Sequence, residues 1–181
     1  RQGCCFLDDG ERAKLGKYIL RANGTMNPEI VGKSAQVIAK LADITIPAGT
    51  RIIVAPEDGV GYGHPYSNEK LAPILAFYRA PDYKQVCETC EEILCYEGAG
   101  HTFSIHSQNE EIIAHFSARI PVSRVIVNGG STLGGIGATT GLVPALTLGC
   151  GAEGGSSTSD NVGPLNLINK RLVAYPLKTT A

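Results

Sequence analysis

The apolar positions of the chain follow a helical spacing at first and the pattern of short buried strands afterwards. Behind Asp8 and Asp9, which are good helix caps, hydrophobic residues recur every three or four positions until Asn23-Gly24 supplies a stop. This pattern predicts a helix over residues 10–22. Ser34 begins a second helical pattern, which ends before a Pro-Ala-Gly turn.

Several later apolar runs have the length and composition of buried strands. They lie at 51–55, 73–78 and 122–127, and a shorter strand is expected at 101–106. Residues 56–68 follow neither period and are rich in Pro, Gly and Tyr, so they predict an exposed loop. Loops of this length often carry function.

Helices are predicted between these strands. Asp82 is placed to cap one that ends at Gly98, and Ser107 and Glu110 have the spacing of a capping box for another. Alternating strands and helices indicate right-handed crossovers in a parallel sheet that is covered on both faces. The fold class that the residues predict is therefore α/β.

The regular pattern ends after Asn128. About forty residues rich in Gly, Ser, Thr and Pro follow, before one last apolar run at 172–177. An irregular segment of this length inside a compact domain is either functional or disordered.

Composition and charge narrow the class of protein. The 181 residues are 43% hydrophobic and 18% charged, which is enough apolar material for the core of one domain. The formal net charge of -1 gives no general attraction to nucleic acid, and no apolar run approaches the roughly 20 residues of a membrane helix. We therefore expect neither nucleic acid nor a membrane as a partner.

The cysteines and the N-terminus bear on the cellular setting. The 6 cysteines follow no regular disulfide framework, which favours a reducing cytoplasm. The sequence begins RQGCCFLDDG, without an initiator Met or the order of a signal peptide. We therefore expect a segment of a longer protein.

Two motifs have both a functional and a structural interpretation. VGKS at 31–34 resembles the end of a phosphate-binding loop, but Asn27 stands where the motif needs Gly, so a helix start is favoured. Cys87 and Cys90 have the spacing of a zinc or redox pair, but they share a helical face and no second pair completes the ligands. We expect core thiols there and predict no metal site.

Single polar residues are ambiguous when taken alone. Cys4 and Cys5 have no His or Asp nearby to activate a nucleophile, and Cys150 is notable only because its neighbouring glycines permit close approach of a ligand. His101, at a strand start, and Glu69, in a loop, are by default ordinary polar positions. The residues alone establish an α/β domain with a long Gly/Ser/Thr-rich loop.

Several segments, taken together and in order, resemble the CoA-acylating aldehyde dehydrogenases. This group includes enzymes of bacterial microcompartments and the N-terminal half of bifunctional aldehyde/alcohol dehydrogenases. VGKSAQVIAKLADITIP (31–47) fits the family, so the resemblance covers nearly the whole chain. The segments with the strongest resemblance are EKLAPILAFYRAPD (69–82), EGAGHTFSIHSQN (97–109), VSRVIVNGGSTLGGIG (122–137), PALTLGCGAEGGSSTSDNVGP (144–164) and NLINKRLVAYP (166–176).

The resemblance implies both a fold and a reaction. The fold is a Rossmann-like three-layer parallel sheet, the catalytic domain, over 1–165, with a C-terminal oligomerisation strand and tail at 166–181. In the reaction, a cysteine thiolate attacks a short-chain aldehyde, a hydride passes to NAD(P)+, and coenzyme A releases the product as acyl-CoA. The protein would be a homo-oligomer in the cytoplasm or in the lumen of a bacterial microcompartment.

The same resemblance implies roles for individual residues. Glu69 matches a glutamate that binds the nicotinamide-side ribose, and Leu71 replaces an aromatic residue of hydrolytic relatives, which favours the acylating branch. His101 matches a pocket histidine that donates to, or shuttles a proton for, the CoA thiol. The substrate pocket would be lined by Asn128, Thr147, Leu148, Gly149 and Cys150.

The nucleophile itself is expected elsewhere. In the family it precedes the segment that resembles RQGCCFLDD, so we expect it upstream of Arg1 together with a separate coenzyme-binding domain; neither Cys4 nor Cys5 stands in its motif. The isolated chain should fold without turning over aldehyde. The alternative is a non-catalytic assembly module derived from this family, whereas an independent nucleotide-binding protein built on VGKS is disfavoured.

Overall fold

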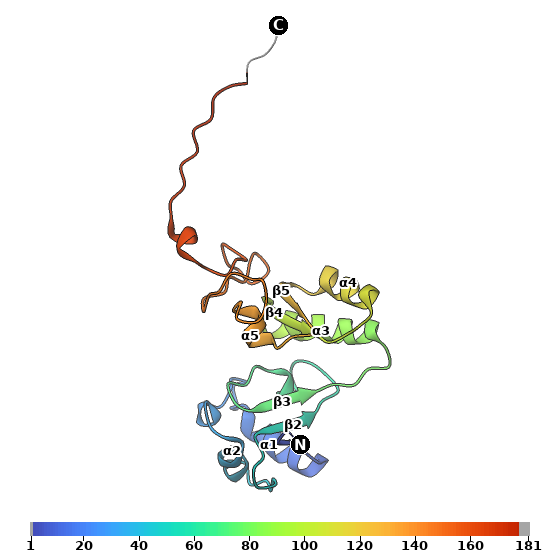
Figure 1. The fold of residues 1–181 in the computed structure, drawn as a ribbon. Helices are drawn as coiled ribbons and strands as arrows, with labels where there is room; N and C mark the ends of the chain where they lie inside the picture. The colour runs from blue at the N-terminus through green and yellow to red at the C-terminus, as the bar shows by residue number, and fades with distance from the viewer. Residues whose placement is uncertain (1, 178–181) are drawn as a thin grey trace. The chain divides into compact units, whose positions relative to one another are not determined.

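The computed structural model describes residues 2–177, which fall into two compact units. Unit 1 comprises the residues up to 99 together with 114–121, and unit 2 comprises 100–113 and the residues from 122 onward (Figure 1). Each unit contains its own parallel sheet. The predicted α/β class with parallel strands is confirmed, although the strands form two sheets, one of three strands and one of two.

The sheet of unit 1 has the order β1-β2-β3. Its strands are β1 (Cys4–Phe6), β2 (Ile52–Pro56) and β3 (Ile74–Phe77), and both pairings are parallel. β2 is the central strand because it pairs with β1 on one side and with β3 on the other. The sequence did not predict β1, because three residues are too few to show a period.

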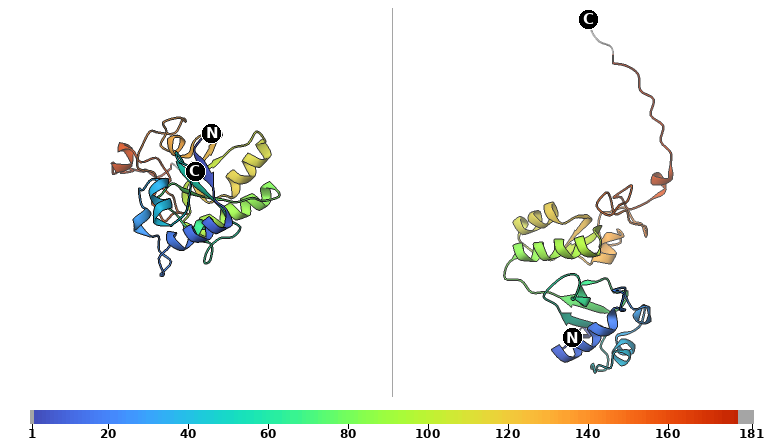
Figure 2. Two further views of the ribbon diagram at one scale, coloured as in Figure 1. Left: turned by 90° about the horizontal axis from the view of Figure 1, so that it is seen from below. Right: turned by 180° about the vertical axis from the view of Figure 1, so that it is seen from behind.

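Side-chain caps define the helices of unit 1, which can be followed in Figures 1 and 2. Asp8 caps α1 (Asp9–Ile19), Ser34 caps α2 (Ala35–Leu41), and Asp82 caps α3 (Tyr83–Glu97), each through a bond from a first-turn amide to the side chain. α3 ends at Gly98, whose φ of 127° is accessible chiefly to glycine. These caps and this stop match the sequence predictions.

α1 is shorter than the predicted helix 10–22. The helix ends at Ile19, and Leu20 adopts an extended conformation and pairs with Met26 in an isolated antiparallel bridge. A turn that includes Asn23 and Gly24 therefore closes this small hairpin instead of ending the helix directly.

Buried aliphatic side chains from α1, α2 and the sheet form the core of unit 1. Leu15 and Ile19 of α1, Ile38 of α2 and Ile53 of β2 are fully buried in one cluster. Each such side chain contributes about 1.5–3 kcal/mol through removal of its surface from water. This core holds the sheet and the loops that leave its carboxyl ends.

The segment 56–68 is only partly the exposed loop that was predicted. Tyr66 is 2% exposed, and its hydroxyl donates to the carbonyl of Arg12 at 2.7 Å, which ties a short 3-10 helix (Pro65–Ser67) to α1. Glu57 is also buried, at 8% exposed. Composition predicts exposure here, but insertion of Tyr66 against α1 overrides it.

Unit 2 contains the parallel pair β4 (Gly100–Ile105) and β5 (Val122–Val127). The chain passes between them through α4 (Glu110–Arg119). The predicted capping box of Ser107 and Glu110 is wrong: the Asn109 side chain caps the helix by accepting from the amides of residues 111 and 112. Ser107 instead accepts a bond from the Asn109 amide.

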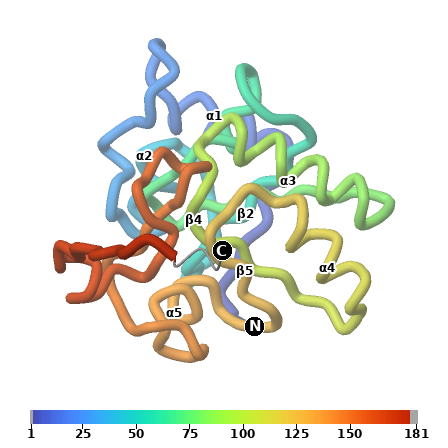
Figure 3. The backbone as a smooth tube through the Cα atoms, turned by 90° about the horizontal axis from the view of Figure 1, so that it is seen from above, coloured from blue at the N-terminus to red at the C-terminus, as the bar shows by residue number. Residues whose placement is uncertain are grey.

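The chain after β5 is irregular, as predicted, but it is ordered by its own hydrogen bonds. A short helix, α5 (Ser131–Gly135), is followed by a loop that folds back on itself, drawn in orange and red in Figure 3. The amides of Gly149 and Gly151 donate to the carbonyls of Asp160 and Thr158, at 2.8 and 2.9 Å. Segment 147–162, called here the glycine loop, is therefore a distorted hairpin.

Residues 171–177 run as extended chain and are assigned to no strand. Their large apolar side chains are exposed, with Leu172 at 92% and Tyr175 at 85%. The oligomerisation strand stays a prediction, and its tail at 178–181 lies outside the described residues. Among the described residues, no helix is both long and apolar enough to cross a membrane.

Candidate functional site

His101 lies on unit 2 where β4 begins, and its side chain is exposed. Its Nδ1 atom lies 3.0 Å from the Thr102 hydroxyl oxygen. The histidine borders a cavity of about 250 Å³ that Leu148 of the glycine loop also lines. The other lining residues are Thr102, Ser131, Thr132, Ile136 and Leu146. The structure thus brings two of the predicted site residues, His101 and Leu148, to one cavity.

Gly100 allows the glycine loop to approach β4 closely. Its φ is +98°, and a Cβ atom built there would lie 2.3 Å from the carbonyl oxygen of Cys150 and 2.6 Å from the amide of Gly154. Gly149 is similarly crowded, because its Cβ would lie 2.2 Å from the carbonyl oxygen of Thr158. Backbone packs on backbone here, and only glycine fits.

Arg124 of β5 holds the same loop from the sheet side. This arginine is 5% exposed, and its guanidinium donates to the carbonyls of His101, Gly149 and Ser159 at 3.3, 2.6 and 2.9 Å. Its Nε donates to the Thr102 hydroxyl at 3.1 Å. No carboxylate within ion-pair distance of it is found among the described residues. One buried cation therefore joins the start of β4 to both arms of the glycine loop.

The other predicted pocket residues have different surroundings. Cys150 lines a separate cavity of about 640 Å³ with Ser123 and the serines of the glycine loop. Thr147 is exposed, and its carbonyl accepts a bond from the amide of Val162. Asn128 has a φ of +52°, and its side-chain amide bonds both the amide and the carbonyl of Ser107. Asn128 therefore joins the ends of β4 and β5 and does not line the His101 cavity.

Glu69 and Leu71 lie on unit 1, on a backbone segment that is held from two sides. The Glu97 carboxylate accepts one bond from the Asn68 side chain at 2.9 Å and another from the Glu69 amide. Lys70 donates to the carbonyls of residues 66 and 68, and burial lowers the pKa of its ammonium group. Leu71 is 54% exposed.

The Glu69 carboxylate itself is exposed, and no bond to its oxygens is recorded within the described part of the chain. Both oxygens are therefore available as acceptors for a ligand. The Glu97 carboxylate fixes the backbone that carries the Glu69 side chain, which restricts where the Glu69 carboxylate can lie.

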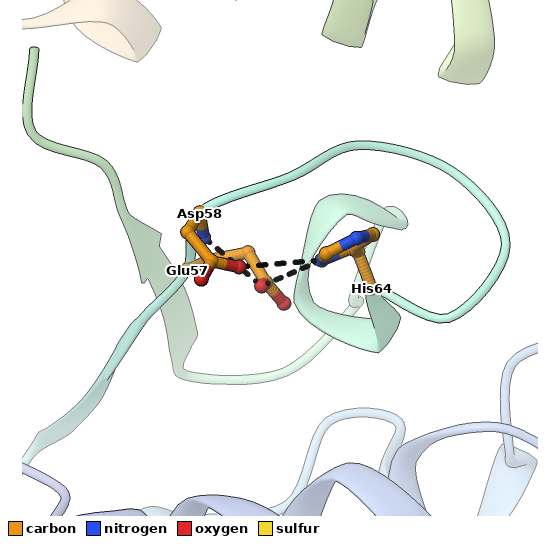
Figure 4. A group of neighbouring side chains, drawn as sticks. All are labelled: Glu57, Asp58 and His64. Carbon is orange, nitrogen blue, oxygen red and sulfur yellow. Dashed lines mark hydrogen bonds and ion pairs between the residues drawn. The ribbon is translucent and has the colours of Figure 1, made fainter.

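A further cluster, which no pattern in the sequence predicts, lies where β2 ends, as Figure 4 shows. His64 turns toward two carboxylates, with its Nδ1 3.0 Å from Glu57 Oε1 and 3.6 Å from Asp58 Oδ1. The three ligand atoms lie close enough together to hold a metal ion, but Arg12 is 4.0 Å from the same Glu57 oxygen and opposes a cation. Gly59 lies directly beneath the imidazole ring, where a Cβ would clash. The contacts of His64 with Glu57 and Asp58 therefore hold the two ends of the loop 57–64 together.

Burial acts against activation of three cysteines in unit 1. Cys87 is fully buried on α3, and burial raises the pKa of the Cys5, Cys87 and Cys90 thiols, which opposes thiolate formation. The prediction of core thiols is confirmed at Cys87. The VGKS segment is a helix start, as favoured from sequence, because the Ser34 hydroxyl accepts from the amide of Val37.

Comparisons with known proteins give a coherent set of relatives, although no protein-family model matches. A probable aldehyde dehydrogenase from Listeria monocytogenes is 59% identical, with a TM-score of 0.92 over 98% of this chain and 40% of its own. An acetylating aldehyde dehydrogenase from Geobacillus thermoglucosidasius is 43% identical, with a TM-score of 0.91 over 99% of this chain and 40% of its own. The bifunctional aldehyde-alcohol dehydrogenase AdhE of Escherichia coli K12 is 37% identical over 174 residues, 93% of this chain and 20% of its length.

More distant solved structures share the fold. A Rhodopseudomonas palustris propionaldehyde dehydrogenase with bound propionyl-CoA and an engineered glycolyl-CoA reductase with bound NADP+ are each 24% identical, with TM-scores of 0.72. A propionaldehyde dehydrogenase of a Clostridium phytofermentans microcompartment has a TM-score of 0.74. The chain spans two fifths or less of the relatives named here.

Proposed function

The chain belongs to the CoA-acylating aldehyde dehydrogenase family and matches part of the length of its members, and we propose that it forms one side of an acylating aldehyde dehydrogenase active site. The reaction oxidises a short-chain aldehyde to acyl-CoA through a cysteine thiolate that residues outside this chain supply. The observation that carries the proposal is the meeting of His101 and Leu148 at one cavity, from two segments that resemble the family.

The coenzyme fits unit 1 through Glu69. When bound, NAD(P)+ accepts the hydride. The exposed Glu69 carboxylate accepts hydrogen bonds from the hydroxyls of the nicotinamide-side ribose, on a backbone that Glu97 holds in place. Leu71, half exposed two residues further on, offers a branched aliphatic contact in place of an aromatic ring.

His101 acts in the second half of the reaction. Its imidazole lines the cavity and serves the acyl transfer to the CoA thiol through a hydrogen bond or a proton. Thr147, Gly149 and Cys150 belong to the glycine loop that carries Leu148 to this cavity, whereas Asn128 joins the carboxyl ends of β4 and β5.

The C-terminal segment serves assembly. Apolar side chains at 171–177 are exposed in the single chain, and burying them as an added strand in a homo-oligomer removes this surface from water. Residues 1–165 then form the catalytic part and 166–181 the assembly part. The protein works in the cytoplasm or in a microcompartment lumen.

The proposal is tested by grafting the chain into the Geobacillus thermoglucosidasius enzyme in place of the segment that it matches. We expect the graft to form NADH continuously from acetaldehyde only when CoA is present, and at most one NADH per active site without it. Glu69→Gln should raise the KM for NAD+, whereas Glu88→Gln, on an exposed face of α3, should not. A folded graft without activity would favour the non-catalytic assembly module.

The two half-reactions are separated by single-turnover kinetics. His101→Ala should slow thioester release by about 10²–10⁴-fold and leave hydride transfer nearly unchanged, so a burst of NADH precedes slow turnover. His106→Ala, at an exposed position directly after β4, is the matched control and should show no burst. Equal loss in both steps would remove His101 from the acyl-transfer step.

A further inference from the structure

The Thr102 hydroxyl lies between two nitrogen atoms of very different character. On one side Arg124 Nε is 3.1 Å away, and on the other His101 Nδ1 is 3.0 Å away. A guanidinium only donates hydrogen bonds, so the hydroxyl oxygen is the acceptor in the first of these contacts. The distance between His101 Nδ1 and the Thr102 hydroxyl does not show which of the two donates. This direction decides which nitrogen of His101 carries the ring hydrogen.

Arg124 is held so that its Nε–H group keeps this direction. Its other donors bond the carbonyls of His101, Gly149 and Ser159, and the side chain is almost fully buried. Turning the guanidinium away from Thr102 would break these bonds and leave a buried cation without acceptors. The hydroxyl oxygen therefore accepts from Arg124 permanently.

The hydroxyl hydrogen then has one recorded acceptor among the described residues, His101 Nδ1. If Nδ1 donated instead, the oxygen would accept from two donors, one of them cationic, and the half-buried hydroxyl hydrogen would have no partner. We propose that Arg124 and Thr102 form a donor relay that makes Nδ1 of His101 an acceptor and places the ring hydrogen of the neutral imidazole on Nε2.

The relay gives His101 a definite role, which rests on the proposed function. An imidazole with hydrogen on Nε2 offers a bound acyl group or thiol sulfur a hydrogen-bond donor, and it has no free lone pair with which to take the CoA proton. Arg124 and Thr102 are thus positioning residues. They orient a ring that borders the cavity, and Arg124 also bonds the glycine loop, whose Leu148 lines the same cavity.

The tautomer can be measured on the 181-residue chain itself, without turnover. Nitrogen-15 NMR of labelled histidine distinguishes the protonated ring nitrogen from the acceptor nitrogen at a pH where imidazole is neutral. His106 is exposed and has no recorded ring contact within the described residues, so it is an internal reference for a free imidazole. The resonance of His101 is assigned by its loss in His101→Gln.

We expect the Nδ1–H form of His101 to be populated about fivefold less than that of His106, the ratio that one net hydrogen bond provides. Thr102→Val keeps the shape of the side chain but removes the hydroxyl, so it should bring the tautomer ratio of His101 to that of His106. Thr102→Ser keeps the hydroxyl and should keep the wild-type tautomer ratio. Equal ratios at His101 and His106 in the wild type, a dominant Nδ1–H form, or no response to Thr102→Val would overturn the relay.

Apart from the assignment through His101→Gln, the comparison of the two histidines is made in the wild-type chain, so poor folding of Thr102→Val leaves the question decidable. The relay and the proposed function also fail separately. A grafted enzyme without activity, with His101 held in the Nε2–H form, would reject the function and keep the relay. An active graft in which His101 and His106 have the same tautomer ratio would reject the relay and keep the function.

Discussion

Substitution of Gly100 by alanine should detach the glycine loop from β4 without affecting unit 1. The added Cβ would lie 2.3 Å from the Cys150 carbonyl oxygen and 2.7 Å from the Gly154 Cα, all backbone atoms, so a gap of roughly 1 Å must open before ordinary contact is reached. Overpacking of this kind costs about 1–3 kcal/mol, and the positive φ adds about 1–2 kcal/mol for a residue with a side chain.

The control is Gly155→Ala in the same loop. Gly155 also has a positive φ, +69°, but nothing lies within 4 Å of the position of its Cβ. Gly155→Ala therefore has the strain of a positive φ but no steric clash at the added Cβ atom. The difference between the two variants isolates the contact of the loop with β4, about 1–3 kcal/mol.

Amide hydrogen exchange followed by NMR measures this difference locally. The reporting amides are those of Gly149, Gly151 and Gly154, which donate to carbonyls inside the glycine loop. Their exchange should be about 5- to 150-fold faster in Gly100→Ala than in Gly155→Ala, while the amides of β2 keep their protection. Equal exchange of the loop amides in the two variants would refute the reasoning from steric contact.

Two further predictions concern the carboxylates of α3. In the grafted enzyme, Glu97→Ala should raise the KM for NAD+ by about tenfold, because it releases the Asn68 side chain and the Glu69 amide. Glu88→Ala is the control, and an equal KM for NAD+ in the two variants would contradict this role of Glu97. The bidentate bond from Arg119 lowers the pKa of Glu91. The stability that the Arg119–Glu91 pair adds should be complete above the pKa of about 4.3 that Glu91 has in the unfolded chain. It should be lost as pH falls through the lower pKa that Glu91 has in the folded protein. Urea midpoints of wild type and Glu91→Gln should therefore converge in acid, and a constant difference would count against the pair.

The sequence predicted those parts of the fold that depend on local chemistry. Capping by Asp8, Ser34 and Asp82 involves atoms three residues apart, so the pattern contains the whole interaction. The strand β1 depends instead on pairing of Cys5 with Ile53, far along the chain, and no local period reveals it. Burial of Glu57 likewise depends on Arg12 and on the loop that returns through His64.

The site was predictable in part. Resemblance to a family identified His101 and Leu148 as pocket residues, and the structure brings them together. The role of Arg124 was missed, although strand alternation places it on the same face as Ile126, and both are buried. An arginine at an inward position of an apolar strand indicates a buried network of acceptors. Its actual acceptors are backbone carbonyls, which the amino-acid sequence does not distinguish.

The bonds of Arg124 also bear on the order in which the chain folds. Its acceptors lie 22 to 35 residues away, in both directions along the chain. Closing such loops costs entropy before any contact forms, whereas α4 begins from local contacts. β4 pairs with β5 across 22 residues, which is less than the 25 and 35 residues that separate Arg124 from its acceptors in the glycine loop. We therefore expect the glycine loop to dock last, on a sheet that already presents the guanidinium. The cavity beside His101 would then be completed in the final step of folding, at the moment when the buried charge acquires its acceptors.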